Sequence, residues 1–466
     1  MKKLLPKKYR RLLWVGLLAC LVLYVLGSLL APPLAGTQRK SDRQIQLPAP
    51  VAERVCLVDG NEEALRWRLR LIRSAQSEIV LSTFDFRIDE SGSDVVAALL
   101  DAAERGVQVR LLVDGMNAQL HLQGSTAFQA LAAHENADVR FYNPLRLTRL
   151  WTVNYRCHDK YLIIDRNAYL LGGRNTSDLF LGSGGTTRQN MDRDVVVCGS
   201  GSGRGSVAAL LGYFEDIWAL DTNWEFRANG EKGTVQRAAA ALRERWAAIT
   251  GAGRVTPIDW DGETMQAGGV TVLHGDCAAR NKEPVLLNTL TALMQGGRER
   301  IVVQTPYIIC NRAMYDALEK AAGGAAQVQI ITNAPQSGAN PWGCADYLNQ
   351  KKAILSTGAS VCEWHGERSM HTKTILIDDR FSVIGSFNWD MRSAYLDTEL
   401  MLLVDCPELN AALRAETDEM VRQGRLLLPD GTAVEGAAYT APEMPLYKKL
   451  LQPVLRVVIR PFRYVL

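Results

Sequence analysis

Two stretches decide the fold of this chain: HDKYLIIDRNAYLLGGRN over residues 158–175 and HTKTILIDDRFSVIGSFN over residues 371–388. Both match the pattern HxKxxxxDxxxxxxG(G/S)xN, and the second begins 213 positions after the first. The chain has only six histidines, and two of them open these frames. Because chance does not plausibly supply two such frames, the sequence predicts an internal duplication.

The segments around the two frames repeat one order of elements. A helical pattern, a β-rich strand, a second helix and a second strand follow one another over residues 63–114, and the same order returns over residues 286–333. Strands that alternate with helices predict a sheet covered by helices, and the recurrence predicts two such units. The predicted fold class is α/β, with two pseudo-symmetric lobes, each a mixed β-sheet flanked by helices, preceded by one transmembrane helix.

Hydropathy and charge divide the rest of the chain. Residues 12–30 hold nineteen positions without a charge, which as a helix would span about 28 Å and cross a membrane once. The predicted units are a basic cytoplasmic N-terminus (1–11), a transmembrane helix (12–30), a linker (31–54), a first lobe (55–260), a second lobe (261–435) and a basic amphipathic tail (436–466).

The charges beside the apolar stretch predict its orientation. Lysines and arginines crowd residues 2–11, so the positive-inside rule predicts a single-pass cell-membrane protein with its catalytic body on the extracytoplasmic side. A cleaved signal peptide is the alternative, but its apolar region is usually about 7 to 15 residues long. A lipidated form at Cys20 ranks low, because ten more uncharged residues follow that cysteine.

The overall composition excludes several classes of protein. Hydrophobic residues make up 47% and charged residues 22%, which is typical of a globular protein and not of a disordered or polytopic one. The net charge of +3 argues against a protein that coats nucleic acid. Nine cysteines include no CxxC pair. The eight cysteines that follow Cys20 could form disulfides outside the membrane, whereas Cys198, Cys310 and Cys406 also suit buried thiols.

The spacing within each frame suits chemistry at a phosphodiester. On a strand, residues two apart share a face, so each histidine would lie beside its lysine, as His158 beside Lys160. An imidazole can attack phosphorus or carry a proton, since its pKa lies near 6.5. Ammonium and amide groups, from the lysines and from Asn175 and Asn388, would hold the negative phosphate oxygens. The Gly-Gly and Gly-Ser pairs permit close backbone approach or a simple hairpin bulge.

The two frames resemble the HKD motif of the phospholipase D superfamily, whose members build one active site from two copies. The resemblance covers roughly residues 55 to 425, and the layout is similar to that of bacterial cardiolipin synthases. It implies catalytic residues His158, Lys160, Asp165, His371, Lys373 and Asp378, and substrate-binding residues Asn175, Asn388, Gly173 and Ser386. The two aspartates lie at an odd offset from their histidines, however, which favours a role as turn anchors over direct catalysis.

The resemblance also implies a carboxylate that orients each histidine. An acid at the head of an apolar strand serves this purpose in the family, and it corresponds to Asp194 and Glu399 here. The first lobe reaches this position 36 residues after its histidine and the second lobe reaches it 28 residues after. The register between Asp192 and Asp194 therefore stays open.

The function that these features predict is a membrane-anchored phosphatidyltransferase. It would make cardiolipin from phosphatidylglycerol and a second phospholipid through a phosphohistidine intermediate. The alternatives are a phospholipase D or nuclease that hydrolyses phosphodiesters, and a non-catalytic lipid-binding scaffold. No metal and no other cofactor is expected, and the expected partners are phospholipid substrates in the membrane, without stable nucleic acid; protein partners are not predicted.

The C-terminal residues 446–466 carry five basic side chains among aliphatic ones and no acid. Such a segment can lie among anionic lipid headgroups. It can equally pack on the protein surface, since Pro453 and Pro461 interrupt a continuous helix.

Overall fold

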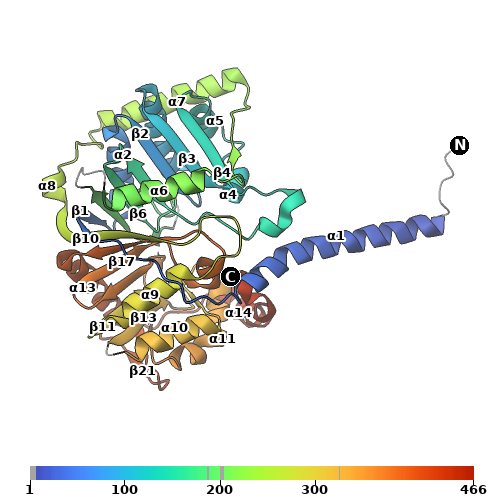
Figure 1. The fold of residues 1–466 in the computed structure, drawn as a ribbon, viewed down its shortest axis with the longest axis vertical. Coiled ribbons are helices and arrows are strands. Elements are labelled where there is room, and N and C mark those ends of the chain that lie inside the picture. Colours follow the sequence, from blue (N-terminus) through green and yellow to red (C-terminus); the bar gives the residue numbers. More distant parts are fainter. Residues whose placement is uncertain (1–6, 186–187, 200–203, 325) are drawn as a thin grey trace.

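The computed structural model describes residues 7–185, 188–199, 204–324 and 326–466 (Figure 1). Two α/β lobes lie against each other, and a long N-terminal helix leads away from them. The predicted fold class is confirmed. The first part of the predicted N-terminal unit, residues 1–6, lies outside the described residues.

The elements of the first half follow the predicted alternation. They are α1 (Lys7–Gly36), β1 (Val51–Val58), α2 (Asn61–Ser74), β2 (Glu78–Thr83), α3 (Glu90–Glu104), β3 (Gln108–Asp114), α4 (Gly115–His121), α5 (Thr126–Ala132), β4 (Ala137–Tyr142), the 3-10 helix η1 (Leu147–Thr152), β5 (Tyr161–Ile164), β6 (Ala168–Gly172), β7 (Asn190–Met191), β8 (Asp194–Cys198), α6 (Ser206–Trp218), β9 (Trp224–Glu225) and α7 (Lys232–Gly251).

The second half repeats this order and adds a C-terminal helix. Its elements are α8 (Trp260–Glu263), β10 (Met265–His274), α9 (Val285–Gln295), β11 (Arg300–Gln304), β12 (Ile308–Ile309), α10 (Arg312–Ala322), β13 (Gln327–Asn333), α11 (Pro341–Leu355), β14 (Ser360–Trp364), β15 (Ser369–Met370), β16 (Thr374–Ile377), β17 (Phe381–Gly385), β18 (Trp389–Asp390), α12 (Met391–Tyr395), β19 (Leu400–Asp405), α13 (Pro407–Gln423), β20 (Arg425–Leu427), β21 (Ala433–Glu435), α14 (Leu446–Val458) and the 3-10 helix η2 (Arg460–Val465).

The two lobes share one continuous sheet of 17 strands, although the sequence suggested a separate sheet in each lobe. The first lobe contributes strands in the order β9-β4-β3-β2-β5-β6-β8-β1, and the second contributes β10-β19-β17-β16-β11-β13-β14-β20-β21. The antiparallel pair β1–β10 joins them at the centre. The order outward from this pair is the same on both sides, so the duplication produces a pseudo-twofold axis.

Helices cover both faces of this sheet. In the first lobe α2, α3, α5 and α7 bury one face, and in the second lobe α9, α10 and α11 do so. A third core lies on the other face, where residues of both lobes pack beneath α6 and α13. Because this shared core includes strands on both sides of the central pair, it fixes one lobe against the other.

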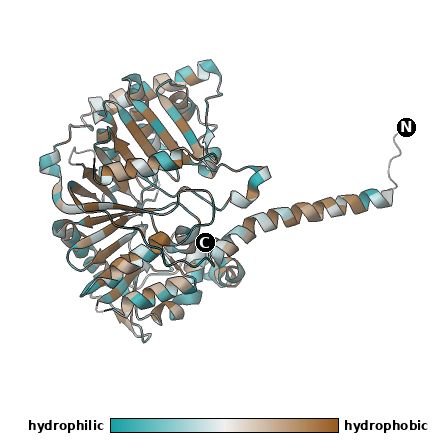
Figure 2. Cartoon of the chain, in the orientation of Figure 1, coloured by the Kyte–Doolittle hydropathy of each residue, from teal (hydrophilic) through white to brown (hydrophobic). Residues whose placement is uncertain are grey.

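Two elements at the N-terminal end extend past the predicted limits of their units. Helix α1 runs to Gly36, past residue 30, and Pro33 and Gly36 in its last turn are buried. The predicted linker is also shorter, since β1 begins at Val51 and pairs with both β8 and β10. The apolar part of α1, coloured brown in Figure 2, is long and apolar enough to cross a membrane over Tyr9–Gly36.

The nine cysteines are all free thiols. Cys310 and Cys406 are buried, as the apolar surroundings in the sequence suggested, and Cys198 is half-buried. The disulfide alternative is therefore not realised here.

Candidate active site

The two histidines lie where each motif enters its strand. Residues His158 to Lys160 form an irregular extended segment directly before β5, and residues His371 to Lys373 do so before β16. The sequence placed both segments on regular strands. They are instead held by contacts with the opposite lobe: the His158 backbone N–H donates to Thr398 Oγ1, and the His371 N–H donates to the Met191 carbonyl.

A carboxylate of the second lobe orients the histidine of the first. His158 Nδ1 lies 3.0 Å from Glu399 Oε1, and both side chains are buried. The Phe84 ring packs edge-on against the imidazole, with ring centroids 5.1 Å apart. Glu399 is itself held at 2.5 Å by the hydroxyl of Ser393, which donates to it. The ring of His158 is thus fixed from both lobes.

The converse pair uses a carboxylate of the first lobe. His371 Nδ1 lies 2.6 Å from Asp192 Oδ2, and the Phe180 ring packs against the imidazole with centroids 4.9 Å apart. Short parallel strands β7 and β15 bring the two segments together. Where Asp192 accepts a hydrogen bond from Nδ1–H of His371, the lone pair of this imidazole lies at Nε2. Lys373 Nζ also lies 2.6 Å from Nδ1 of His371.

The structure corrects the predicted partner Asp194. In the sheet, Gly172 pairs with Asp194 and Gly385 pairs with Met401, so Asp192 is the equivalent of Glu399. Asp194 is fully buried and contacts two arginines, with Arg68 Nη1 at 2.9 Å and Arg174 Nη1 at 3.3 Å. Its charge neutralises those guanidinium groups inside the first lobe and does not reach a histidine.

The lysines lie close to the histidines that precede them. Lys160 Nζ donates to the His158 carbonyl at 2.5 Å, and Lys373 Nζ donates to the His371 carbonyl and lies 3.7 Å from Asp192 Oδ2. Burial lowers the pKa of both ammonium groups, that of Lys160 to about 8. Two buried cations beside two histidines form a site for an anion.

The motif aspartates stand outside this site. Asp165 lies in the turn after β5 with a φ of 48°, and its carboxylate accepts the backbone N–H groups of residues 76–78. Asp378 has the same φ in the turn after β16 and accepts the N–H groups of residues 298–300. Neither aspartate therefore lies where it could act in catalysis, which is the role that the family resemblance implied. Both aspartates fix the start of the neighbouring strand, as the odd offset indicated.

Gly173 and Ser386 support the carboxylates, not the substrate. A Cβ at Gly173 would overlap the Asp192 carboxylate, so only glycine leaves room for it. The Ser386 hydroxyl donates to Glu399 Oε2 at 2.5 Å and is 1% exposed. Both residues were expected to bind substrate, but these contacts leave neither free to do so.

The two asparagines retain free polar atoms in the site. Oδ1 of Asn175 and Oδ1 of Asn388 are buried and have no hydrogen-bond partner among the residues that the structure describes. Asn388 Nδ2 donates to the Tyr307 hydroxyl at 3.3 Å. A cavity of about 280 Å³ beside His371 is lined by Asn175, Phe180 and Tyr307 among others. No distinctive spacing in the sequence would have identified four further residues at the site: Phe84, Phe180, Thr398 and Ser393.

The two histidine–carboxylate pairs differ in charge. Burial raises the pKa of Glu399 to about 8 and lowers that of His158 well below its usual value, so this pair is neutral at pH 7. Burial would also raise the pKa of Asp192, but Lys373 and His371 hold it below its usual value. Burial lowers the pKa of His371 to about 4. Asp192 is therefore ionised beside a neutral imidazole, which suits a nucleophile.

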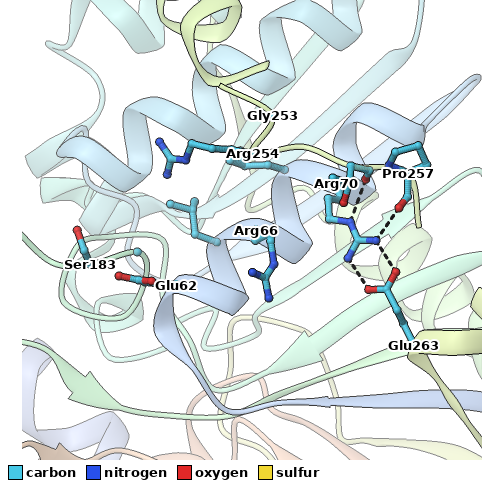
Figure 3. Close-up of a pocket in the computed structure, with 12 residues that line it drawn as sticks. Glu62, Arg66, Arg70, Ser183, Gly253, Arg254, Pro257 and Glu263 are labelled. Carbon is cyan, nitrogen blue, oxygen red and sulfur yellow. Dashed lines mark hydrogen bonds and ion pairs between the residues drawn. The ribbon is translucent and has the colours of Figure 1, made fainter. Parts of the chain in front are cut away.

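A larger cavity than the one beside His371 lies elsewhere. It has a volume of about 670 Å³ and opens on the first lobe between α2 and the segment before α8. On the wall of this cavity, the guanidinium group of Arg70 donates hydrogen bonds to the Glu263 carboxylate and to the Pro257 carbonyl (Figure 3). No residue of either motif lines this cavity. Among the described residues, no group of three or more His, Cys, Asp or Glu side chains could hold a metal ion.

Comparison with known proteins agrees with this geometry. The family described as "Cardiolipin synthase, PLD-like domain" matches residues 69–218 and 290–421, which is more than half of the chain. The chain belongs to this family. Each matched segment contains one histidine motif and lies within one lobe. The chain is therefore an enzyme of the phospholipase D type, which transfers phosphodiester groups. The family match also supports a phospholipid phosphatidyltransferase.

Individual relatives are distant. "Cardiolipin synthase C" of Escherichia coli is 25% identical over 385 residues, covering 74% of this chain and 80% of the relative. An "Uncharacterized protein" of Helicobacter pylori is 23% identical over 414 residues, covering 79% of each. The crystal structure of a phosphatidylserine synthase from Haemophilus influenzae superposes with a TM-score of 0.61 at 15% identity, covering 88% of this chain and 95% of that one. At this level of identity, the similarity shows that the two proteins share a fold.

Proposed function

We propose that this protein is a membrane-anchored phosphatidyltransferase that makes cardiolipin from phosphatidylglycerol and a second phospholipid. The observation that carries the proposal is the pair of buried histidines, each held at Nδ1 by a carboxylate from the opposite lobe. Two imidazoles in one site supply the nucleophile and the proton carrier that a double displacement needs.

In the first step, Nε2 of one histidine attacks the donor phosphorus. A P–N bond forms, the P–O bond to the leaving alcohol breaks, and the other histidine gives its proton to that alkoxide. In the second step this other histidine takes the proton of an incoming glycerol hydroxyl, whose oxygen displaces the first histidine and breaks the P–N bond. Lys160, Lys373 and the two asparagines would hold the phosphate oxygens throughout.

The electrostatics favour His371 as the nucleophile. It is neutral at pH 7 and its Nδ1 is held by an ionised carboxylate, which raises the basicity of the opposite ring nitrogen. His158 would then be the proton carrier: its Nε2–H would protonate the leaving alkoxide while its Nδ1 takes the proton of the neutral Glu399 carboxyl, which lies 3.0 Å away. A covalent phosphoryl adduct on His371, trapped by denaturation at alkaline pH, where the P–N bond is stable, and located by mass spectrometry, is the expected result. An adduct on His158 would reverse the two roles.

The anchor is part of the proposal. We place the N-terminus in the cytoplasm and the two lobes on the extracytoplasmic side. Helix α1 would then keep the site at the membrane surface, where acceptor lipid is concentrated and where an ordered acceptor can compete with water for the phosphohistidine. Transfer should therefore exceed hydrolysis when the enzyme acts on a bilayer.

The decisive experiment is lipid analysis. Expression in a bacterial host without its own cardiolipin synthases should restore cardiolipin, measured by mass spectrometry, and the His371→Ala variant should not. Purified full-length protein in phosphatidylglycerol vesicles should yield more cardiolipin than phosphatidic acid. If only phosphatidic acid appeared, or if DNA were cut while lipid stayed intact, the synthase proposal would fail and the phosphodiester chemistry would remain.

A further inference from the structure

We propose that a second surface of this protein, separate from α1, docks on the lipid bilayer. We call it the docking surface and define it as residues 145–152, which include η1, together with the outward face of α14. Its occupant is the headgroup region of the anionic bilayer that α1 crosses. The inference rests on α1 as a membrane anchor and does not depend on which phospholipid the enzyme transfers.

The first part of the docking surface is an apolar protrusion with basic neighbours. Leu147 is 77% exposed, and Leu145 and Trp151 are exposed beside it. Arg146 and Arg149, also exposed, alternate with these apolar side chains, and no acidic residue occurs between Asp138 and Asp159. Exposed leucine and tryptophan next to arginine are typical of a segment that enters the headgroup region.

The contact of this protrusion with α1 sets its depth. The Tyr24 hydroxyl donates to the Leu147 carbonyl at 2.8 Å, and Asn154 Nδ2 donates to the Leu29 carbonyl at 2.8 Å. Tyr24 lies six residues before Leu30, the end of the uncharged stretch, which is about 9 Å along a helix. When α1 spans the bilayer, η1 therefore reaches below the outer end of the apolar span, at the boundary between headgroups and acyl chains.

The second part is α14, which faces outward with its apolar side. Leu455 and Ile459 turn inward and pack against Ala345 of α11, so the helix is fixed on the second lobe. On the outer side Leu446, Leu450 and Val457 are 65–72% exposed. Lys449, Arg456 and Arg460 are exposed among them, and the chain has no acid after Glu443.

Both parts lie at the base of α1. Helix η2, which directly follows α14, contacts α1, as does η1, and Figure 1 shows α14 and the C-terminus beside the point where α1 leaves the body. A cytosolic or periplasmic protein partner would not require this proximity to the anchor. The position, the apolar exposure and the one-sided positive charge together favour the bilayer as occupant.

The docking surface is also tied to the active-site cavity. Lys448 Nζ donates to the carbonyls of Gln336 and Gly338, at 2.7 Å and 2.9 Å. Gly338 lines the cavity beside His371. A helix that rests on the headgroups would therefore hold the rim of this cavity at the membrane surface, where lipid headgroups can enter it.

The test uses tryptophan emission from full-length protein in vesicles of equimolar phosphatidylcholine and phosphatidylglycerol, with and without bromine in the acyl chains. Bromine quenches only tryptophans that reach the lipid. Trp151→Phe should remove a component that bromolipid quenches, whereas Trp224→Phe, an exposed tryptophan on the outer edge of the first lobe, should remove an unquenched one. Tyr447→Trp on α14 should add a quenched component, and Val434→Trp on β21 should add an unquenched one.

The dependence of quenching on lipid composition completes the test. Quenching at Tyr447→Trp should be roughly twofold stronger in the mixed vesicles than in phosphatidylcholine alone, because the surface is basic. Equal quenching of the Tyr447→Trp and Val434→Trp components would overturn the proposal, as would quenching at only one of the two parts. Shielding from aqueous iodide without bromolipid quenching would assign the surface to a protein contact instead. None of these readouts requires turnover, so their failure is distinct from failure of the proposed function.

Discussion

Nδ1 of His158 lies 3.0 Å from Oε1 of Glu399, a residue 241 positions later in the chain and in the other lobe. The converse contact joins His371 to Asp192, which are 179 positions apart. Each lobe thus supplies a histidine to one pair and a carboxylate to the other. Neither lobe has a complete catalytic pair by itself, so the active site depends on the packing of the two lobes against each other.

Removal of either histidine should abolish turnover. We expect His158→Ala and His371→Ala each to lower kcat by roughly 10³-fold or more. Both histidines act in the same reaction, so the loss of either one removes most of the rate enhancement that the pair provides. Cardiolipin formation in vesicles measures the effect, and thermal unfolding checks the fold. His134→Ala, which changes a histidine outside the site, should retain activity. Substantial turnover in either site variant would mean that the lobes work separately.

The two orienting carboxylates should respond differently to amide substitution. Asp192→Asn removes an ionised group and should lower kcat by roughly 10²- to 10⁴-fold. Glu399→Gln replaces a carboxyl whose pKa burial raises to about 8, so a neutral amide should cost less than about tenfold at pH 7. Each variant serves as the control for the other. Equal losses of kcat would contradict the difference in charge between the two histidine–carboxylate pairs.

Asp194 should matter for stability and not for chemistry. Asp194→Asn leaves the buried Arg68 and Arg174 without a counter-charge, and breaking a buried ion pair in this way costs about 3 to 5 kcal/mol. We expect a lower unfolding midpoint in detergent and a nearly unchanged kcat per folded molecule. A selective loss of kcat with normal stability would restore the role that the sequence first suggested.

The alkaline limb of activity should report Lys160. Burial lowers the pKa of its ammonium group to about 8, so its positive charge is present below that pH and is lost above it. The value of kcat/KM, which reflects the free enzyme, should therefore fall as pH rises through about 8. Lys160→Arg keeps the charge and should move this limb to higher pH while lowering the maximum. An unshifted limb in Lys160→Arg would assign it to another group.

The orientation in the membrane can be tested with thiol labelling of intact cells. A cysteine at the exposed Gly230 should react with an impermeant reagent before lysis, because we propose that the lobes lie outside the cytoplasm. A cysteine at Tyr9 should react only after lysis. The reverse pattern would overturn the proposed topology.

Sequence periodicity predicted the repeated lobes because each helix and strand carries its own pattern of apolar residues. It could not predict that β1 and β10 would join the two sheets, since strand pairing between lobes depends on edges that no local pattern describes. The same limit applies to Asp192 and Asp194, which lie two residues apart in one segment. Only the pairing of Gly172 with Asp194 showed which of them corresponds to Glu399.

The sequence by itself determined the chemistry of this protein. Two histidine frames, an uncharged stretch of nineteen residues and a basic tail are local patterns, and local patterns identify residue types that can attack phosphorus, cross a membrane or bind anionic lipid. The tertiary structure alone decided which carboxylate meets which histidine, that Gly173 and Ser386 serve those carboxylates, and that η1 and α14 flank the base of α1. These relationships join residues far apart in the chain, and they depend on how the two lobes pack across the pseudo-twofold axis.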